Sequence, residues 1–100
     1  MSDLHWLTAS AAAHAIATRK LSPVELTQAL LDRIERLDPQ LNAFIRVDGE
    51  AALQAAKAAE EEAVSGRLRG PLHGVPVGIK DIIDVAGLAT TCHSKVLEDN

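Results

Sequence analysis

The composition of the chain changes sharply at Gly66, and this change limits the folds that the chain can adopt. Before Gly66 the sequence is rich in alanine and leucine, whereas five of the six glycines lie from Gly66 onward. Glycine and proline interrupt helices and favour turns and extended segments. We therefore predict an N-terminal helical region over residues 1–66 and the start of an α/β core over residues 67–100.

Two helices are predicted in the first part of the helical region. Thr8 can cap a helix from about Ala9 to Arg19. Ser22 is followed by proline at the first helical position and by glutamate three residues on, which is a strong helix start. Apolar residues then recur every three or four positions and predict one buried face, formed by Leu26, Leu30, Ile34 and Leu37 and continued by Leu41. Pro39 is expected to stop this helix near Asp38.

A third helix is predicted from about Gly49 to Ser65, with Asp48 as its cap and Gly66 as its end. Residues 42–47 are expected to form a strand or an extended connection before it. Glu60, Glu61 and Glu62 point in three directions around a helix, so they indicate a solvated face and not a pair of catalytic carboxylates.

The segment from Val75 to Ile79 has the alternation of a β-strand, with bulky residues on one face and Pro76, Gly78 and Lys80 on the other. Combined with the helices, it predicts an α/β fold in which N-terminal helices pack on the beginning of a mixed β-sheet. A lysine at the end of such a strand is well placed for chemistry, because a neutral amine can accept a hydroxyl proton.

Several classes of function are disfavoured by composition. The net charge is −4 and no basic stripe is present, so we expect no direct binding to nucleic acid. The single cysteine, Cys92, cannot form an internal disulfide, and no stretch has the length and apolarity of a membrane span, which favours a soluble cytoplasmic protein. His5, His14 and His73 are too scattered for a metal site, and we expect each to be a surface histidine or a satisfied core histidine. No cofactor is expected.

A general base needs a nucleophile, and the residues near Lys80 do not supply an obvious one. The hydroxyl residues in this part of the chain lie outside any glycine-framed elbow that would present them to a substrate; they are Ser65, Thr90, Thr91 and Ser94. A Cys92–His93 dyad is disfavoured, because neighbours in an extended segment point to opposite faces.

The stretch from Gly70 to Asn100, GPLHGVPVGIKDIIDVAGLATTCHSKVLEDN, resembles the lysine-bearing segment of the amidase signature family. The similarity lies in the Gly-Pro-Leu-His-Gly lead-in, the Val-Pro-Val segment, Lys80 with Asp81, and the Thr-Thr-Cys-x-Ser-Lys-x-Leu-Glu stretch. The upstream phrases Ser-Pro-Val-Glu-Leu and Leu-Asn-Ala-Phe are also similar to that family. His93 departs from the family pattern, which commonly has glycine there, and the imidazole could alter the pocket.

The resemblance implies hydrolysis of an amide bond by a serine, cis-serine and lysine triad, with Lys80 as the general base. The two serines belong to a glycine- and serine-rich tract that does not occur in residues 1–100. We therefore interpret the chain as the N-terminal part of an amidase acting on a small-molecule amide, a truncated fragment or short product that is inactive in isolation.

Two alternatives stay open. The chain could belong to the A subunit of a glutamyl-tRNA(Gln) amidotransferase, which would need partner subunits and ATP. It could instead be a non-catalytic interaction module that self-associates, or binds a protein, through the exposed edges of the Val75–Ile79 strand.

Overall fold

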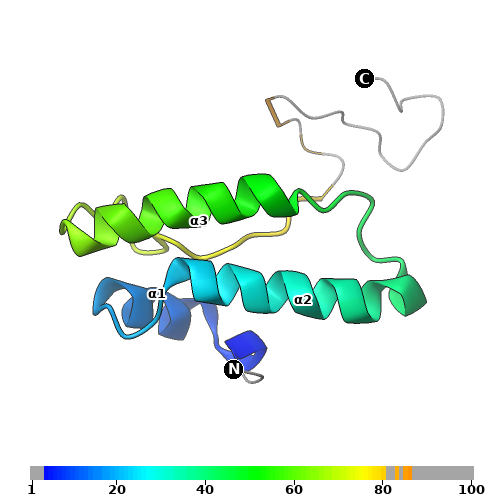
Figure 1. Cartoon of the computed structure of the whole chain (residues 1–100), viewed down its shortest axis with the longest axis horizontal. Helices are drawn as coiled ribbons and strands as arrows, with labels where there is room; N and C mark the ends of the chain where they lie inside the picture. Colours follow the sequence, from blue (N-terminus) through cyan, green and yellow to red (C-terminus); the bar gives the residue numbers. More distant parts are fainter. Residues whose placement is uncertain (1–3, 81–82, 84, 87–100) are drawn as a thin grey trace.

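The structure is a computed structural model that describes residues 4–80, 83, 85 and 86. In these residues a short 3₁₀-helix, η1 (Leu4–Trp6), precedes three α-helices (Figure 1). The α-helices are α1 (Ala9–Ala17), α2 (Pro23–Leu41) and α3 (Gly49–Val64).

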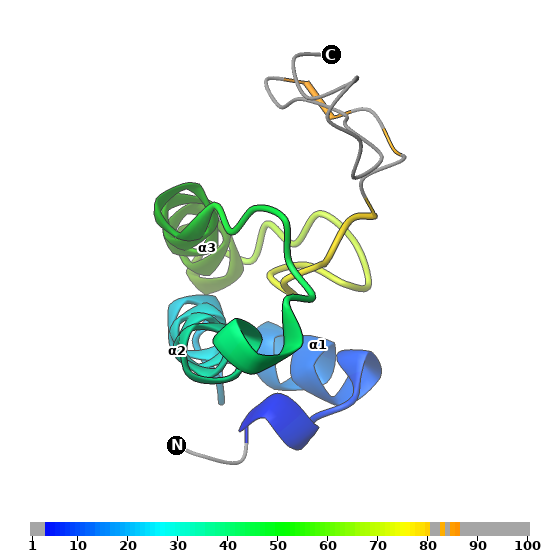
Figure 2. The same ribbon diagram turned by 90° about the vertical axis from the view of Figure 1, so that its right-hand side faces the viewer.

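The two long helices, α2 and α3, lie side by side and run in opposite directions (Figures 1 and 2). Helix α1 lies near the start of α2 and contacts α3, whereas η1 contacts α2. After α3 the chain turns and runs back along the helices as the yellow segment of Figure 1, on the side of α2 and α3 where α1 lies (Figure 2). This returning segment leads to Lys80.

Helix α1 begins as predicted and ends two residues early. The hydroxyl of Thr8 accepts a hydrogen bond from the backbone N–H of Ala11 at 3.0 Å, so the predicted cap is confirmed. At the other end Arg19 adopts a left-handed conformation with φ of 60°, which turns the chain away from the helix axis. The turn carries Leu21 into the core.

The start of α2 is also confirmed, but its predicted end is wrong. Ser22 caps the helix by accepting the N–H of Val24 at 3.1 Å, and Pro23 is the first helical residue. Helix α2 then continues through Pro39 to Leu41. A proline in the last turn removes only one hydrogen bond, the one to the carbonyl of the residue four positions earlier, and the neighbouring bonds compensate for that loss.

These neighbouring bonds lie around Asp38. Asn42 is left-handed, with φ of 51°, and donates its N–H to the carbonyl of Asp38 at 2.7 Å. The carboxylate of Asp38 accepts the N–H groups of Ala43 and Phe44 at 2.7 and 3.2 Å. The helix end is therefore closed by one aspartate and not by the proline.

Residues 42–47 form a connection without strand pairing, in which Phe44, Ile45 and Val47 are all exposed. Asp48 occupies the cap position of α3 but makes no capping bond, because its carboxylate lies 3.4 Å from Nε of Arg46 instead. Helix α3 ends at Val64, and Gly66 follows with a φ of 75°, which confirms the predicted end.

The hydrophobic core is small and joins all three α-helices. Its buried members are Ala12, Ile16, Leu21, Leu26 and Ala63, with Leu30 and Val75 packed against them. The predicted face of α2 is only partly confirmed, because Leu26 is buried, whereas Leu30, Ile34 and Leu37 are half-buried and Leu41 is 68% exposed. The apolar face is therefore covered only at the end of α2 where α1 and the returning segment lie.

The predicted α/β fold is wrong for the residues that the structure describes, since they contain helices and no strand. A strand needs a partner for its backbone N–H and C=O groups. The N–H of Val75 instead bonds locally to the carbonyl of Leu72, and Val77 is 80% exposed. Bulky and small residues do alternate from Val75 to Ile79, but no described segment pairs with this stretch. The described residues therefore contain no strand edge of the kind proposed for self-association.

None of the helices in the described part of the chain combines the length and apolarity needed to cross a membrane.

We expect Ile16→Ala to destabilise the chain by about 2–5 kcal/mol, because Ile16 is 1% exposed and its removal leaves a cavity between α1, α2 and Gly74. Ile45→Ala is the matched control, since Ile45 is 54% exposed, and we expect a change within about 0.5 kcal/mol. Denaturant unfolding followed by circular dichroism measures both. If Ile16→Ala is unfolded from the start, Ile16→Val should still cost about 0.5–1.5 kcal/mol. Equal losses at the two positions would contradict the core described above.

Candidate functional site

Lys80 is exposed and lies near the end of the returning segment. Its backbone carbonyl accepts the N–H of Ile83 at 3.1 Å. The five residues before Lys80 lie outside any helix, and the last three of them are exposed. The position of the lysine therefore depends on how the segment is held further upstream.

His73 makes one hydrogen bond to α3 and a second to the turn that follows the helix. Its imidazole is buried, and Nδ1 accepts the backbone N–H of Arg69 at 3.1 Å. Nε2 lies 2.8 Å from the carbonyl oxygen of Ala59 in α3. Since Nδ1 accepts a hydrogen bond, it carries no proton, and Nε2 is the nitrogen that donates to Ala59. The ring is therefore neutral, with both nitrogens satisfied, as expected of a core histidine.

Gly74 presses the same segment against the first two helices. Its φ is +83°, a conformation that residues with a side chain rarely adopt. A β-carbon placed on it would lie 3.2 Å from Cγ2 of Ile16 and 3.2 Å from Cβ of Pro23. Both the backbone angle and the close approach therefore require glycine. We call His73 and Gly74 together the His73–Gly74 anchor.

An ion pair reinforces the turn that leads to the anchor. Nε of Arg69 lies 2.8 Å from Oε2 of Glu62 on α3. This hydrogen bond from the Arg69 guanidinium lowers the pKa of Glu62 below its ordinary value of 4.5, and the charges of Arg69 and Arg67 act in the same direction. Glu62 thus differs from the solvated carboxylate predicted for it, whereas its neighbour Glu61 is exposed.

No nucleophile lies with Lys80 among the described residues near it. The hydroxyl of Ser65 donates to the carbonyl of Glu61 at 2.8 Å and so serves the end of α3. The other hydroxyls considered from the sequence, on Thr90, Thr91 and Ser94, lie outside the described residues, as do Cys92 and His93.

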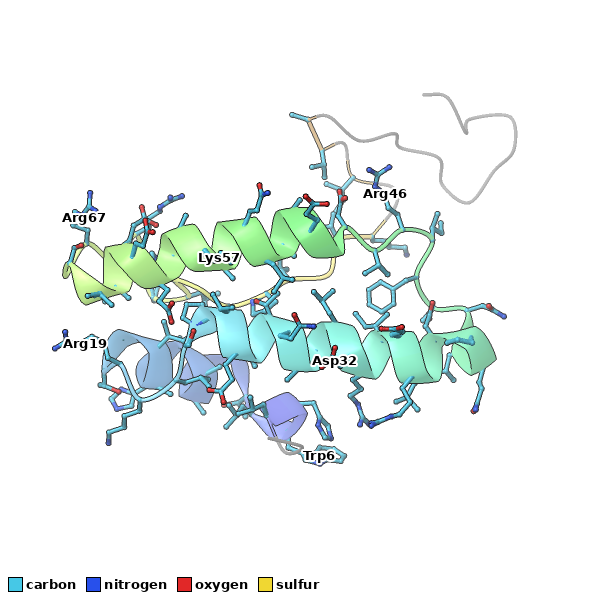
Figure 3. All side chains as sticks on the ribbon, viewed as in Figure 1. Trp6, Arg19, Asp32, Arg46, Lys57 and Arg67 are labelled. Atoms are coloured by element: carbon cyan, nitrogen blue, oxygen red, sulfur yellow. The ribbon has the colours of Figure 1, made fainter. Side chains whose placement is uncertain are left out.

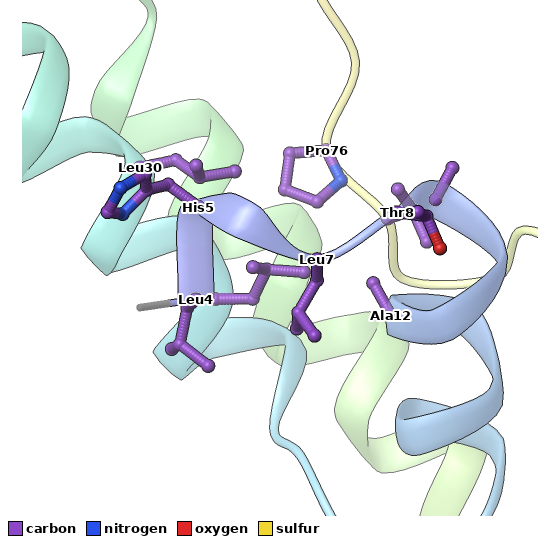
Figure 4. Close-up of a pocket in the computed structure, with 10 residues that line it drawn as sticks. Leu4, His5, Leu7, Thr8, Ala12, Leu30 and Pro76 are labelled. Atoms are coloured by element: carbon purple, nitrogen blue, oxygen red, sulfur yellow. The ribbon is translucent and has the colours of Figure 1, made fainter. Parts of the chain in front are cut away.

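A cavity of about 250 Å³ lies near η1, between α1, α2 and the returning segment (Figure 4). Most of its lining residues have apolar side chains, and His5 and Thr8 are the polar ones. Thr8 already caps α1, and Lys80 does not line the cavity. The cavity and the lysine are therefore separate features, and the cavity by itself holds no acid, base and nucleophile arrangement.

The described histidines, His5, His14 and His73, lie in different parts of the fold. His5 lies beside Trp6, with ring centroids 4.8 Å apart, and Trp6 projects from η1 at the edge of the molecule (Figure 3). His14 is exposed on α1. Across the described part of the chain, no three His, Cys, Asp or Glu side chains form a group that could hold a metal ion.

Sequence reasoning identified the segment but missed how it is held. It treated His73 only as a histidine of no special role, although a histidine beside a glycine, between Leu72 and Val75, indicates a polar group that enters the core next to a close backbone approach. The partner atoms, Ala59 O and Arg69 N, could not have been identified from that pattern.

Comparison with known proteins identifies relatives along almost the whole chain. The family model described as Amidase matches residues 25–100, a range that includes both the anchor and Lys80. Proteins named as the A subunit of glutamyl-tRNA(Gln) amidotransferase are similar to the chain. The one from Chloroflexus aggregans is 48% identical over 97 residues, covering 97% of this chain and 20% of the relative. The one from Acidothermus cellulolyticus is 47% identical over 98 residues, covering 98% of this chain and 19% of the relative. The chain thus spans about a fifth of the length of these curated relatives.

We expect the Glu62–Arg69 pair to stabilise the fold above about pH 4.5 and to lose that effect as the pH falls further. The folded pKa of Glu62 lies below its unfolded value, so the unfolded chain takes up the proton first and acid favours unfolding. Glu62→Gln should therefore flatten the fall in unfolding free energy as the pH drops below about 4.5, measured by denaturant titration at a series of pH values.

Arg46→Gln is the control for this measurement, because Arg46 and Asp48 are 3.4 Å apart with side chains 61% and 47% exposed. Exposed pairs of this kind contribute little. An acid response of Glu62→Gln identical to that of the unaltered chain would contradict the role assigned to the pair.

Proposed function

The chain belongs to the amidase family, and from this we propose that it supplies the lysine of an amide-bond hydrolase of the serine, cis-serine and lysine type. The observation that carries the proposal is the accessible amine of Lys80, at the end of a segment anchored in the core, inside the matched range 25–100. Lys80 is the proposed catalytic residue and the general base.

In the proposed reaction the neutral amine of Lys80 accepts a proton from the hydroxyl of a middle serine, which takes the proton of the nucleophilic serine. The nucleophile forms a bond to the amide carbonyl carbon, the C–N bond breaks, and the amine leaves with a proton returned along the same path. Water then releases the acid from the serine ester. The substrate class is a small-molecule amide, and the two serines come from a glycine- and serine-rich tract outside residues 1–100.

A lysine that acts as a base must be shielded from water, because water favours the charged ammonium. Lys80 is exposed in the structure, and the described residues next to it, such as Ile79, are exposed as well. The groups that shield the amine and stabilise the oxyanion are thus proposed to come from outside the described residues.

The names of the relatives favour a second candidate, the A subunit of a glutamyl-tRNA(Gln) amidotransferase. It would use the same lysine but deliver the released ammonia to a glutamyl-tRNA with the help of partner subunits and ATP. The net charge of −4 is compatible with this candidate if the partners contact the tRNA. An assay that compares transfer of ammonia to glutamyl-tRNA with hydrolysis of free amides discriminates the two candidate functions.

A cytoplasmic location stays a prediction from the sequence.

In a protein of the relatives' full length that contains this chain, we expect Lys80→Ala to lower kcat by at least about 10²–10⁴-fold, the usual contribution of a general base. Lys80→Arg should not restore activity, since a guanidinium stays protonated. Steady-state amide hydrolysis measures both. Lys57→Ala is the matched control, because Lys57 is an exposed lysine on α3 and should change kcat little. Activity retained by Lys80→Ala would refute the proposed role.

The 100-residue chain alone is expected to hydrolyse no amide, because it holds the base without the serine tract. A panel of aliphatic and aromatic amides, with ammonia release as the readout, checks this at high protein concentration. Turnover that disappears on Lys80→Ala would show that the chain carries its own nucleophile, contrary to the proposal.

A further inference from the structure

We propose that His73 is a positioning residue for Lys80, acting through the neutral imidazole that ties the returning segment to α3. The inference rests on the proposed catalytic role of Lys80. We assign His73 no part in proton transfer or bond breaking. Its proposed effect is to restrict the position of the Lys80 amine.

The imidazole of His73 joins the turn that follows α3 to the body of that helix. Nδ1 accepts from Arg69 N at 3.1 Å, and Nε2 donates to Ala59 O at 2.8 Å. The ring is 9% exposed, so water does not readily replace either bond. Loss of the ring would leave the N–H of Arg69 and the turn around it without this connection to α3.

The anchor also sets the length of free chain before the lysine. Gly74 and Val75 pack against the core, and only five residue steps separate Val75 from Lys80. Such a segment spans at most about 17 Å. If the anchor is released, the free chain runs from Arg69, which its ion pair holds to Glu62 on α3, to Lys80, eleven steps.

The size of the effect follows from these two lengths. The effective concentration of a group on a flexible tether falls as about the −3/2 power of the tether length. Lengthening the tether from five to eleven steps therefore lowers the effective concentration of the Lys80 amine at its target by about threefold. This is a minimum, since the loss of orientation lowers the rate further.

Histidine suits this position because one rigid ring offers a donor and an acceptor on different sides. Glutamine offers an amide donor at a similar reach and can keep the bond to Ala59 O, whereas leucine fills the space without either bond. His73→Gln and His73→Leu therefore separate hydrogen bonding from packing. His14→Ala is the matched control, because His14 is exposed on α1.

The activity test uses a protein of the relatives' full length that contains this chain, with rates expressed per folded molecule as measured by circular dichroism. We expect His73→Leu to lower kcat at least about threefold while KM changes less than about twofold, and His73→Gln to recover much of the loss. His14→Ala should leave both constants unchanged. A change in KM alone, or a folded His73→Leu with an unaltered kcat, would overturn the inference.

Two failures are distinguishable in this design. If Lys80→Ala retains full activity, the proposed function itself is refuted. If Lys80→Ala abolishes activity but folded His73→Leu does not slow turnover, Lys80 keeps its role and only the positioning by His73 is refuted.

A second measurement needs no activity. In the 100-residue chain, the ¹⁵N shifts of the His73 ring should show the tautomer protonated at Nε2, and His73→Leu should speed amide exchange at Arg69 and Val75 without affecting the middle of α2. An Nδ1-protonated ring, or unchanged exchange at both amides, would overturn the anchor.

Discussion

The backbone of Gly74 lies against Ile16 and Pro23, and the arrangement of the other parts depends on this contact. It brings the returning segment to the place where α1 ends and α2 begins, and there Val75 joins the core. The core is made of few residues, several of them alanines, so it buries little apolar surface, and the loss of any one contact removes a large share of it. A side chain at residue 74 would separate the segment from both helices.

The His73–Gly74 anchor connects this packing to the proposed chemistry. His73 ties the segment to α3, Gly74 presses it onto α1 and α2, and Lys80 follows after a short exposed stretch. The family match extends through this whole region. The anchor thus restricts the positions that the amine of the exposed Lys80 can occupy. A proton acceptor in a site built from several residues needs such a restriction, because it must be held close to its proton donor.

The sequence predicted well where the determinants are local. Thr8 and Ser22 cap their helices because a hydroxyl needs only the N–H groups two or three residues ahead. It predicted poorly where an unusual local contact or a distant partner decides the structure. The end of α2 was misjudged at Pro39 because the carboxylate of Asp38 closes the helix, and the strand from Val75 to Ile79 was misjudged because no described segment pairs with it. For the site, the sequence identified Lys80 but not its anchor.

By itself, the sequence determined the starts of the three helices, the family to which the chain belongs and the lysine on which the proposed function rests, because capping, periodicity and motif are properties of neighbouring residues. Only the tertiary structure decided that His73 bonds Ala59 and that Gly74 meets Ile16 and Pro23. These contacts join residues far apart in the chain, and their geometry depends on how the helices pack, which no local pattern encodes.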